Sequence, residues 1–278
     1  MRSFINRTGL FLAALCLWPL AAVADYTLSI TPRFSPDVSI KRVTPLADLL
    51  GSVLGQPVKI NLSPTFDDLE QRMRSGQIDV AFITPTQYPF VSGTMEPVAI
   101  IADATDGAKL RGLVITRADS LIHSQNDLKG RSAAIVSEKS AGGYLSQKVA
   151  LDAINVDTTK DMRLQVVADN KQENVVMSVY LGEADVGFVR EDALHVADKY
   201  VPPSQIRVVM LGAWLPNWCI VVKRSLVPQA KNQVRAALLG LKADAPTLKA
   251  LQATAFVPGA DADFDVYRKA LNVPIPTR

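Results

Sequence analysis

The sequence predicts an α/β protein with two similar lobes, and three observations lead to this expectation. Strand-like and helix-like segments alternate along the chain, which is the pattern of α/β proteins. A strand–helix–strand–helix–strand series occurs over residues 26–84 and again over residues 131–189, without an alignable sequence repeat. A late strand-like segment over residues 218–223 then indicates that the chain returns to its first half.

The first series is marked by helix boundaries that the residue types explain. Apolar residues at helical spacing predict a helix over residues 38–54, which Gly55 ends. Thr65 is expected to cap a second helix over residues 65–75, with Asp67 and Asp68 in its first turn. The strands of this series are expected at residues 26–31, 58–62 and 79–84.

The next informative segment is the strand-like run over residues 110–117, and the second series follows it. Its strands are expected at residues 132–136, 164–167 and 185–189, and its helices at residues 141–154 and 172–181. A further strand over residues 206–211 precedes an interruption at Pro216. From Ser225 onward the chain reads as helical, over residues 227–241, 244–254 and 263–271.

These elements predict a first lobe of residues 25–115 plus 217–278 and a second lobe of residues 116–216. The chain would cross twice between the lobes, and two crossing strands form a hinge. In such sheets ligands bind beyond the carboxyl ends of the strands. We therefore expect a ligand site in the cleft between the lobes.

The N-terminus has the order of a secretory signal peptide. Arg2 and Arg7 precede an apolar run over residues 9–20, and the small residues Ala22 and Ala24 follow it. The run is too short to span a bilayer, which takes about 20 residues; an uncleaved anchor is the alternative. We expect residues 1–24 to be removed by cleavage after Ala24, and the mature protein to be periplasmic.

The composition argues against several partners. The chain has 30 basic and 27 acidic residues without a basic run, so we expect no nucleic acid. Cys219 is the one cysteine of the mature chain and lies in an apolar run typical of a buried thiol. His123 and His195 have no metal-ligand spacing. We expect no metal, no cofactor and a monomer.

Three stretches carry a resemblance to a known family. They are residues 45–58 (with Leu54-Gly55-Gln56-Pro57-Val58), residues 76–88 (with Gly76-Gln77-Ile78-Asp79-Val80-Ala81-Phe82), and residues 127–145 (with Asp127-Leu128-Lys129-Gly130-Arg131), beyond which lies Gly182-Glu183-Ala184-Asp185. Their order and spacing resemble the phosphate-, phosphite- and phosphonate-binding components of ABC importers, the PhnD-like proteins. The resemblance implies the type II periplasmic binding protein fold, two lobes that close on a small oxyanion, and delivery to a membrane permease.

The resemblance also implies a ligand site at the start of a second-lobe helix. Phosphonate-binding members carry a Ser-Thr-Ser-Gly run there, and the matching run here is Ser140, Ala141, Gly142 and Gly143. Two hydroxyls are therefore missing, and each would add a hydrogen bond of roughly 0.5–1.5 kcal/mol. Free amides at a helix start bind anions without side chains, and a serine cap with a glycine turn that binds no ligand is the alternative. Ser137, in the loop before this run, belongs to the same candidate set.

Further candidates come from loops that follow predicted strands. Thr84, Thr86 and Tyr88 follow the third strand, where a first-lobe cleft loop is expected, and a turn in which Tyr88 only packs is the alternative. Phe34 follows the first strand, and packing at the surface or hinge is its alternative. Trp214 and Trp218 flank the crossing at Pro216 and would line the cleft or pack in the hinge.

The remaining candidates belong to the second lobe. Gln172 occupies the place where many relatives have a ligand-contacting histidine. Asp185 would meet an amine or hydroxyl of the solute, and its alternative role is to cap a turn at a strand start. Arg190 ends the same strand and is a candidate countercharge for an anionic ligand, and a solvated surface arginine is the alternative.

Three functions compete at this point. The first is the binding component of an importer, and the second is a ligand-binding partner of a membrane sensor kinase, which would use the same cleft. The third is a secreted hydrolase. The sequence has no Gly-x-Ser-x-Gly or His-Glu-x-x-His motif and no plausible Cys/His pair, so we expect a binding protein and not an enzyme.

Overall fold

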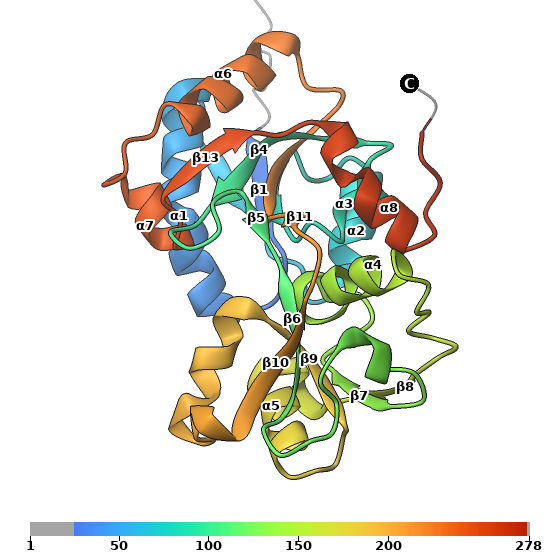
Figure 1. Ribbon diagram of the computed structural model, residues 1–278. Helices are drawn as coiled ribbons and strands as arrows, with labels where there is room; N and C mark the ends of the chain where they lie inside the picture. The colour runs from blue at the N-terminus through green and yellow to red at the C-terminus, as the bar shows by residue number, and fades with distance from the viewer. Residues whose placement is uncertain (1–24, 277–278) are drawn as a thin grey trace, which may run out of the picture.

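The computed structural model describes residues 25–276, so the expected signal peptide over residues 1–24 and its cleavage point lie outside the described residues. Figure 1 shows two α/β bodies, one above the other, connected by crossing segments. One body contains a six-stranded sheet and the other a five-stranded sheet. We call them the first lobe and the second lobe. The predicted α/β class is confirmed.

The first lobe surrounds a sheet of order β13-β4-β12-β3-β1-β2. β1, β2 and β3 are parallel, whereas β12 is antiparallel to β3 and β4. The strands are β1 Tyr26–Ile30, β2 Val58–Ile60, β3 Val80–Ile83, β4 Met95–Ala102, β12 Cys219–Lys223 and β13 Ala255–Pro258. Helices α1 Pro36–Leu54, α6 Pro228–Leu239 and α7 Pro246–Leu251 share one apolar core with this sheet. Helices α2 Phe66–Arg74, α3 Tyr88–Val91 and α8 Asp265–Ala270 lie on the other side (Figure 1).

Two strands of this sheet were not predicted. β4 lies between β12 and β13. It contains Pro97, and because proline rarely occupies an inner strand, the sequence did not indicate a strand here. The pairing of β12 with β4 shifts register between Ile220 and Val221, and Val221 is the partner of Pro97. β13 lies between the two helices expected over residues 244–254 and 263–271, in a part of the chain that reads as helical. α7 stops early because Gln252 adopts a left-handed backbone (φ 58°), and the chain then extends along β4.

The second lobe surrounds a sheet of order β10-β6-β9-β7-β8. Its strands are β6 Gly112–Arg117, β7 Ser132–Ile135, β8 Arg163–Val166, β9 Val186–Arg190 and β10 Ile206–Leu211. Its main helical segments are η2 Ala141–Leu145, α4 Ser146–Asp152, α5 Gln172–Tyr180 and η4 Glu191–Lys199. β7 is parallel to β8 and β9, so the repeated strand–helix plan that the sequence indicated is present.

Two short strands cross between the lobes. β5 Lys109–Leu110 pairs antiparallel with β11 Leu215–Pro216, and Leu110 and Leu215 are buried there. The predicted lobe boundary after residue 115 would divide β6, yet the whole of β6 pairs with β9 and β10 of the second sheet. We therefore propose that the crossings lie at residues 109–111 and 212–216.

Two further findings concern the environment of the chain. Within residues 25–276 no helix combines the length and apolar character that a membrane span requires. Cys219 is fully buried in β12, and this burial raises the pKa of its thiol far above the usual value. The side chain is therefore a packed, unreactive thiol, in agreement with the sequence analysis.

Candidate functional site

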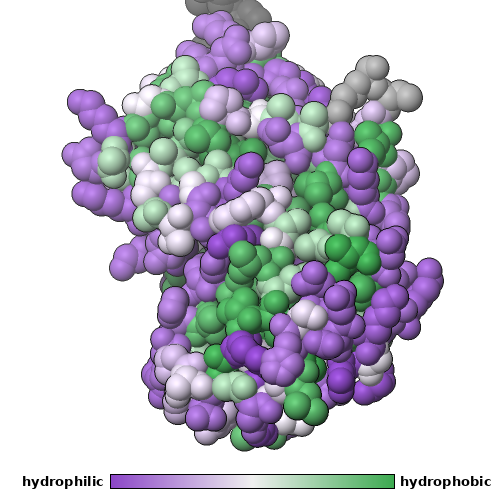
Figure 2. All heavy atoms as spheres, in the orientation of Figure 1, coloured by the Kyte–Doolittle hydropathy of each residue, from purple (hydrophilic) through white to green (hydrophobic). Residues whose placement is uncertain are grey.

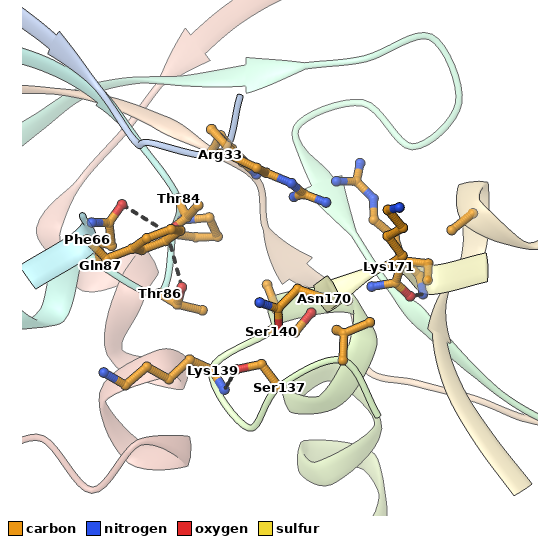
Figure 3. Close-up of a pocket in the computed structure, with 18 of the residues that line it drawn as sticks. Arg33, Phe66, Thr84, Thr86, Gln87, Ser137, Lys139, Ser140, Asn170 and Lys171 are labelled. Atoms are coloured by element: carbon orange, nitrogen blue, oxygen red, sulfur yellow. Dashed lines mark hydrogen bonds between the residues drawn. The ribbon is translucent and has the colours of Figure 1, made fainter. Parts of the chain in front are cut away.

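A cavity of about 790 Å³ lies between the two lobes. Its walls come from the loops that follow β1 and β3 in the first lobe and β7 and β9 in the second, so it lies beyond the carboxyl ends of parallel strands. Figure 3 shows polar side chains from both walls directed into it, among them Arg33, Thr84, Thr86, Ser137, Lys139 and Ser140. This volume suits an organic molecule as well as a single oxyanion.

The second-lobe wall includes the start of a continuous helical segment. Its first turn, Ala141–Leu145, is a π-helix that continues into α4. The Ser140 hydroxyl accepts a hydrogen bond from the Gly143 amide at 3.1 Å. The amides of Ala141 and Gly142 have no acceptor within the helix, because they occupy its first turn. Both residues line the cavity, so two free donors and the positive end of the helix dipole face it.

Arg190 passes directly over this helix start. A Cβ atom on Gly142 would lie 2.8 Å from the Arg190 Cγ, so only glycine admits the stem of this arginine. The guanidinium forms ion pairs with Asp192 at 2.9 Å and with Asp103 at 3.6 Å. Asp103 follows β4 of the first lobe, so this pair connects the two lobes at the edge of the cavity.

The first-lobe wall carries a cluster of hydroxyl and amide groups. The hydroxyls of Thr84 and Thr86 lie 3.1 Å apart. The Gln87 Oε1 accepts hydrogen bonds from the hydroxyls of Thr31 and Thr84. Gln87 is 2% exposed, and its Nε2 atom has no partner within 3.5 Å among the described residues. The Glu70 carboxyl is nonetheless near enough for the Gln87 amide to lower its pKa, so the amide is weakly partnered from that side. The cluster therefore contains a buried donor that a ligand oxygen can satisfy.

Glu70 adds a buried carboxylate to the same wall. Its residue is 8% exposed, and its nearest ion pair is with Arg74 at 3.6 Å. Burial raises the pKa of the Glu70 carboxyl above its usual value, although the charges of Lys139 and Arg74 and the amide of Gln87 oppose this. The ionised form is therefore disfavoured at this position.

Seven of the residues predicted for the site line the cavity. They are Thr84, Thr86, Ser137, Ser140, Ala141, Gly142 and Gln172. Gln172 also positions Arg190, because its Oε1 accepts a hydrogen bond from the Arg190 amide at 3.0 Å. Trp218 lines the cavity as well, whereas Trp214 lies elsewhere with the Arg111 guanidinium 4.4 Å from its ring. Contact of these residues with a ligand stays a prediction.

Two first-lobe candidates do not line the cavity. Phe34 packs under the Arg42 guanidinium, which lies 4.1 Å from the ring centre, so the cavity is lined by its neighbours Pro32 and Arg33 instead. Tyr88 is fully buried, and its hydroxyl donates a 2.5 Å hydrogen bond to Asp261. Its ring points toward Phe264, at 4.7 Å, because α3 begins there and packs on the C-terminal helices.

Two second-lobe candidates also have structural roles. Gly143 is buried behind the helix start, where a Cβ atom would lie 2.6 Å from the Gln172 Nε2. Asp185 lies at the opposite end of the sheet from the cavity, before β9. Its carboxylate accepts hydrogen bonds from the amide and hydroxyl of Ser132, both at 2.8 Å, which is the turn-capping alternative.

The sequence analysis missed several cavity residues, chiefly Arg33, Glu70, Gln87 and Lys139. Arg33 and Gln87 lie next to residues that the sequence analysis named. It therefore identified the correct loops but not these two side chains. Glu70 is in the middle of α2, and no sequence feature marks it as a cavity residue. Whether a glutamate in a helix is buried depends on the residues that surround it in space. Lys139 precedes the Ser140 run and could have been found from that position.

Comparisons with known proteins agree with this architecture. The chain matches the family model of the ABC transporter, phosphonate, periplasmic substrate-binding protein over residues 28–264. A Xanthomonas citri protein bound to ATP shares the fold with TM-score 0.73 and 19% identity, over 89% of this chain and 98% of that one. PhnD1 from Prochlorococcus marinus, in complex with methylphosphonate, has TM-score 0.68 and 15% identity, over 90% and 98%. A binding component of an ABC phosphonate transporter from Pseudomonas aeruginosa has TM-score 0.63 and 20% identity, over 88% and 85%.

These likenesses confirm the predicted type II periplasmic binding protein fold. The family match covers most of the chain and also confirms the resemblance on which the sequence analysis relied. It favours a transport protein over the sensor and hydrolase alternatives. The chain belongs to the family of periplasmic phosphonate-binding proteins of ABC transporters.

Proposed function

We propose that the cavity between the lobes binds a phosphorus oxyanion at the start of the η2–α4 helical segment, for import through an ABC permease. The observation that carries this proposal is the pair of free amides at Ala141 and Gly142, which open onto the cavity. Methylphosphonate is the ligand in the similar Prochlorococcus marinus structure, and ATP is the ligand in the Xanthomonas citri structure. Both ligands contain a phosphorus oxyanion.

The two hydroxyls that Ala141 and Gly142 lack can be replaced from the opposite wall. Thr84 and Thr86 carry hydroxyls on the cavity, and Gln87 carries an amide nitrogen that has no acceptor within 3.5 Å among the described residues. These donors belong to the first lobe, whereas the helix start belongs to the second. An oxyanion that contacts both walls would hold the lobes together, and a permease would then recognise the closed form. We also propose export with cleavage after Ala24 and a monomeric mature protein.

The helix start is tested by placing a charge at Ala141. Methylphosphonate at 100 times its dissociation constant should add ~2.7 kcal/mol to the free energy of unfolding of the wild-type protein. In Ala141→Asp the new carboxylate repels the ligand from the free amides, although it suits the helix dipole and leaves the fold intact. We expect the thermal shift with methylphosphonate to disappear in this variant.

Ala141→Asn is the matched control, because asparagine has nearly the same size as aspartate without its charge. It should retain most of the methylphosphonate shift. A full shift in Ala141→Asp would place the oxyanion elsewhere in the cavity. An equal loss in both variants would mean that side-chain size, rather than charge, disturbs the site.

A further inference from the structure

Arg33 stands out among the charged residues of the cavity. It follows β1 on the first-lobe wall and is an exposed residue, and Figure 3 shows its guanidinium directed into the cavity, where protein atoms surround it more closely. No described carboxylate lies within ion-pair distance of it, whereas Arg190 is paired with Asp103 and Asp192. Arg33 is therefore a charged donor that forms no ion pair within the described part of the chain.

Two other arginines, Arg190 and Arg42, are close enough to Arg33 to affect its pKa. Crowding by protein atoms lowers the pKa of its guanidinium, and the charges of Arg190 and Arg42 lower it further, against the opposing effect of Asp192. Arg190 belongs to the second lobe, so closing the lobes brings like charges toward each other. An anionic group between the two guanidiniums would turn this repulsion into attraction.

The other charged residues of the cavity are placed differently. Lys139 lies 5.4 Å from the Phe90 ring and is close enough to Glu70 to affect the pKa of that carboxyl. Lys171 pairs with Asp169 at 3.8 Å. Glu173 has no ion pair among the described residues, but it lies in the first turn of α5, where the helix dipole favours its negative charge.

The size of the cavity leaves room for more than one anionic group. Its volume of about 790 Å³ is in the range of pockets for whole organic ligands. Phe66, Phe90 and Trp218 supply apolar wall surface. A ligand can therefore place one charged end at the Ala141 amides, an apolar middle on this surface, and a second group at Arg33.

We infer that Arg33, opposite Arg190, forms a second anion subsite, and that the ligand is an organic phosphonate or phosphate with a second anionic group, such as a carboxylate. The inference rests on the proposed oxyanion site at Ala141 and Gly142. It assigns to Arg33 a role in selecting the far end of the ligand.

Three ligands with the same carbon chain test the subsite by calorimetry: 3-phosphonopropionate, n-propylphosphonate and 3-aminopropylphosphonate. A second series with two more carbons allows for the span between the subsites. The wild-type protein should bind the carboxylate ligand of at least one series roughly 10- to 100-fold more tightly than its methyl-ended analogue, since a charge-assisted pair is gained. It should bind the ammonium ligand most weakly.

Arg33→Met keeps much of the apolar stem and removes the charge. It should abolish the preference for the carboxylate end while changing the affinity for n-propylphosphonate less than about twofold. The matched control is Arg42→Met, because Arg42 is a nearby arginine that does not line the cavity. This control should leave the preference in place.

Other results separate the two proposals. An equal loss for all ligands in Arg33→Met would show that Arg33 holds the phosphonate itself, and the second subsite would be overturned. Tightest binding of the ammonium ligand would overturn it in favour of Glu173. If n-propylphosphonate does not bind the folded wild-type protein, the proposed oxyanion site falls, and the second subsite falls with it.

Discussion

Polar residues lie at both ends of the central sheets, but they differ in whether the chain supplies their hydrogen-bond partners. At the ends that face away from the cavity, Gly76 and Gly182 adopt left-handed backbones (φ 74° and 75°), and each is followed three residues later by an aspartate, Asp79 or Asp185. These carboxylates are surrounded by donors from their own chain. At the ends that face the cavity, several polar groups have no such partner.

The details make the contrast clear. The Asp79 carboxylate accepts hydrogen bonds from the amide and hydroxyl of Thr27, at 3.0 and 2.9 Å, and pairs with Lys223 at 2.5 Å. At the cavity, no described residue accepts a hydrogen bond from the Gln87 Nε2 within 3.5 Å, and the Arg33 guanidinium forms no ion pair among residues 25–276. A polar group whose partners the chain supplies contributes to stability, and one whose partner is missing is available to a ligand.

The largest effect is expected from removing Asp79. Asp79→Ala leaves Lys223 and the Thr27 amide without their partner in a half-buried setting, and should lower the free energy of unfolding by about 2–3 kcal/mol. Urea denaturation measures this loss. The affinity for methylphosphonate, measured by calorimetry, should stay the same. A weaker affinity in the folded variant would contradict the claim that polar groups at the far end stabilise the fold without taking part in ligand binding.

Glu70 gives an effect of opposite sign on the cavity side. Because the pKa of its carboxyl is raised in the folded protein, its ionisation destabilises the fold above that pKa. Glu70→Gln should therefore raise the free energy of unfolding at pH 7 by ~0.5–1 kcal/mol. The gain should shrink as the pH falls and the wild-type carboxyl takes up its proton. A gain that is independent of pH would show that side-chain packing causes it.

Asp185 is expected to show the smallest effect, with the reverse pH dependence. Burial alone would raise the pKa of its carboxyl, but the hydrogen bonds from Ser132 and the charges of Arg131 and Arg163 hold it below the usual value. Its stabilisation is present above the unfolded pKa and is lost as the pH falls through the folded pKa. The side chain is partly exposed, so Asp185→Asn should cost less than about 1 kcal/mol at pH 7.

Denaturation curves between pH 3 and pH 7 measure this difference. The curves of Asp185→Asn and the wild-type protein should converge below about pH 4, where the unfolded carboxyl also titrates. Divergence in acid would mean that Asp185 is not held in its ionised form. Glu70 and Asp185 together thus test whether the fold raises the pKa of a carboxyl at the cavity end and lowers it at the far end.

The regular elements were predictable from the sequence, because their signals are local. Helix boundaries at Gly55 and Thr65 follow from backbone freedom and capping, and the structure places α1 and α2 there. β4 was missed because its proline suits a register shift that only the partner strand β12 reveals. β13 was missed because pairing with β4, rather than its own pattern, makes it a strand.

Site residues were predictable where they follow a strand end or a helix start. They were not predictable where the direction of the side chain decides whether it reaches the cavity. Thr84 and Thr86 follow β3 and line the cavity, whereas Tyr88 follows the same strand and turns away toward Phe264. Two to four positions along one loop separate these outcomes. Sequence spacing places the loop, but the packing of α3 on the C-terminal helices chooses which side chains reach the cavity.

By itself the sequence determined the α/β class, the doubled strand–helix plan and the helix start at Ser140, since each depends on residues close together in the chain. Only the tertiary structure decided that Arg33, Glu70, Gln87 and Arg190 share one cavity. These residues come from four separate segments of the chain, in two lobes. Their charges and hydrogen-bonding groups form one site only when the two lobes are in place. Electrostatic and hydrogen-bonding partners are set by distance in space and not by distance along the chain.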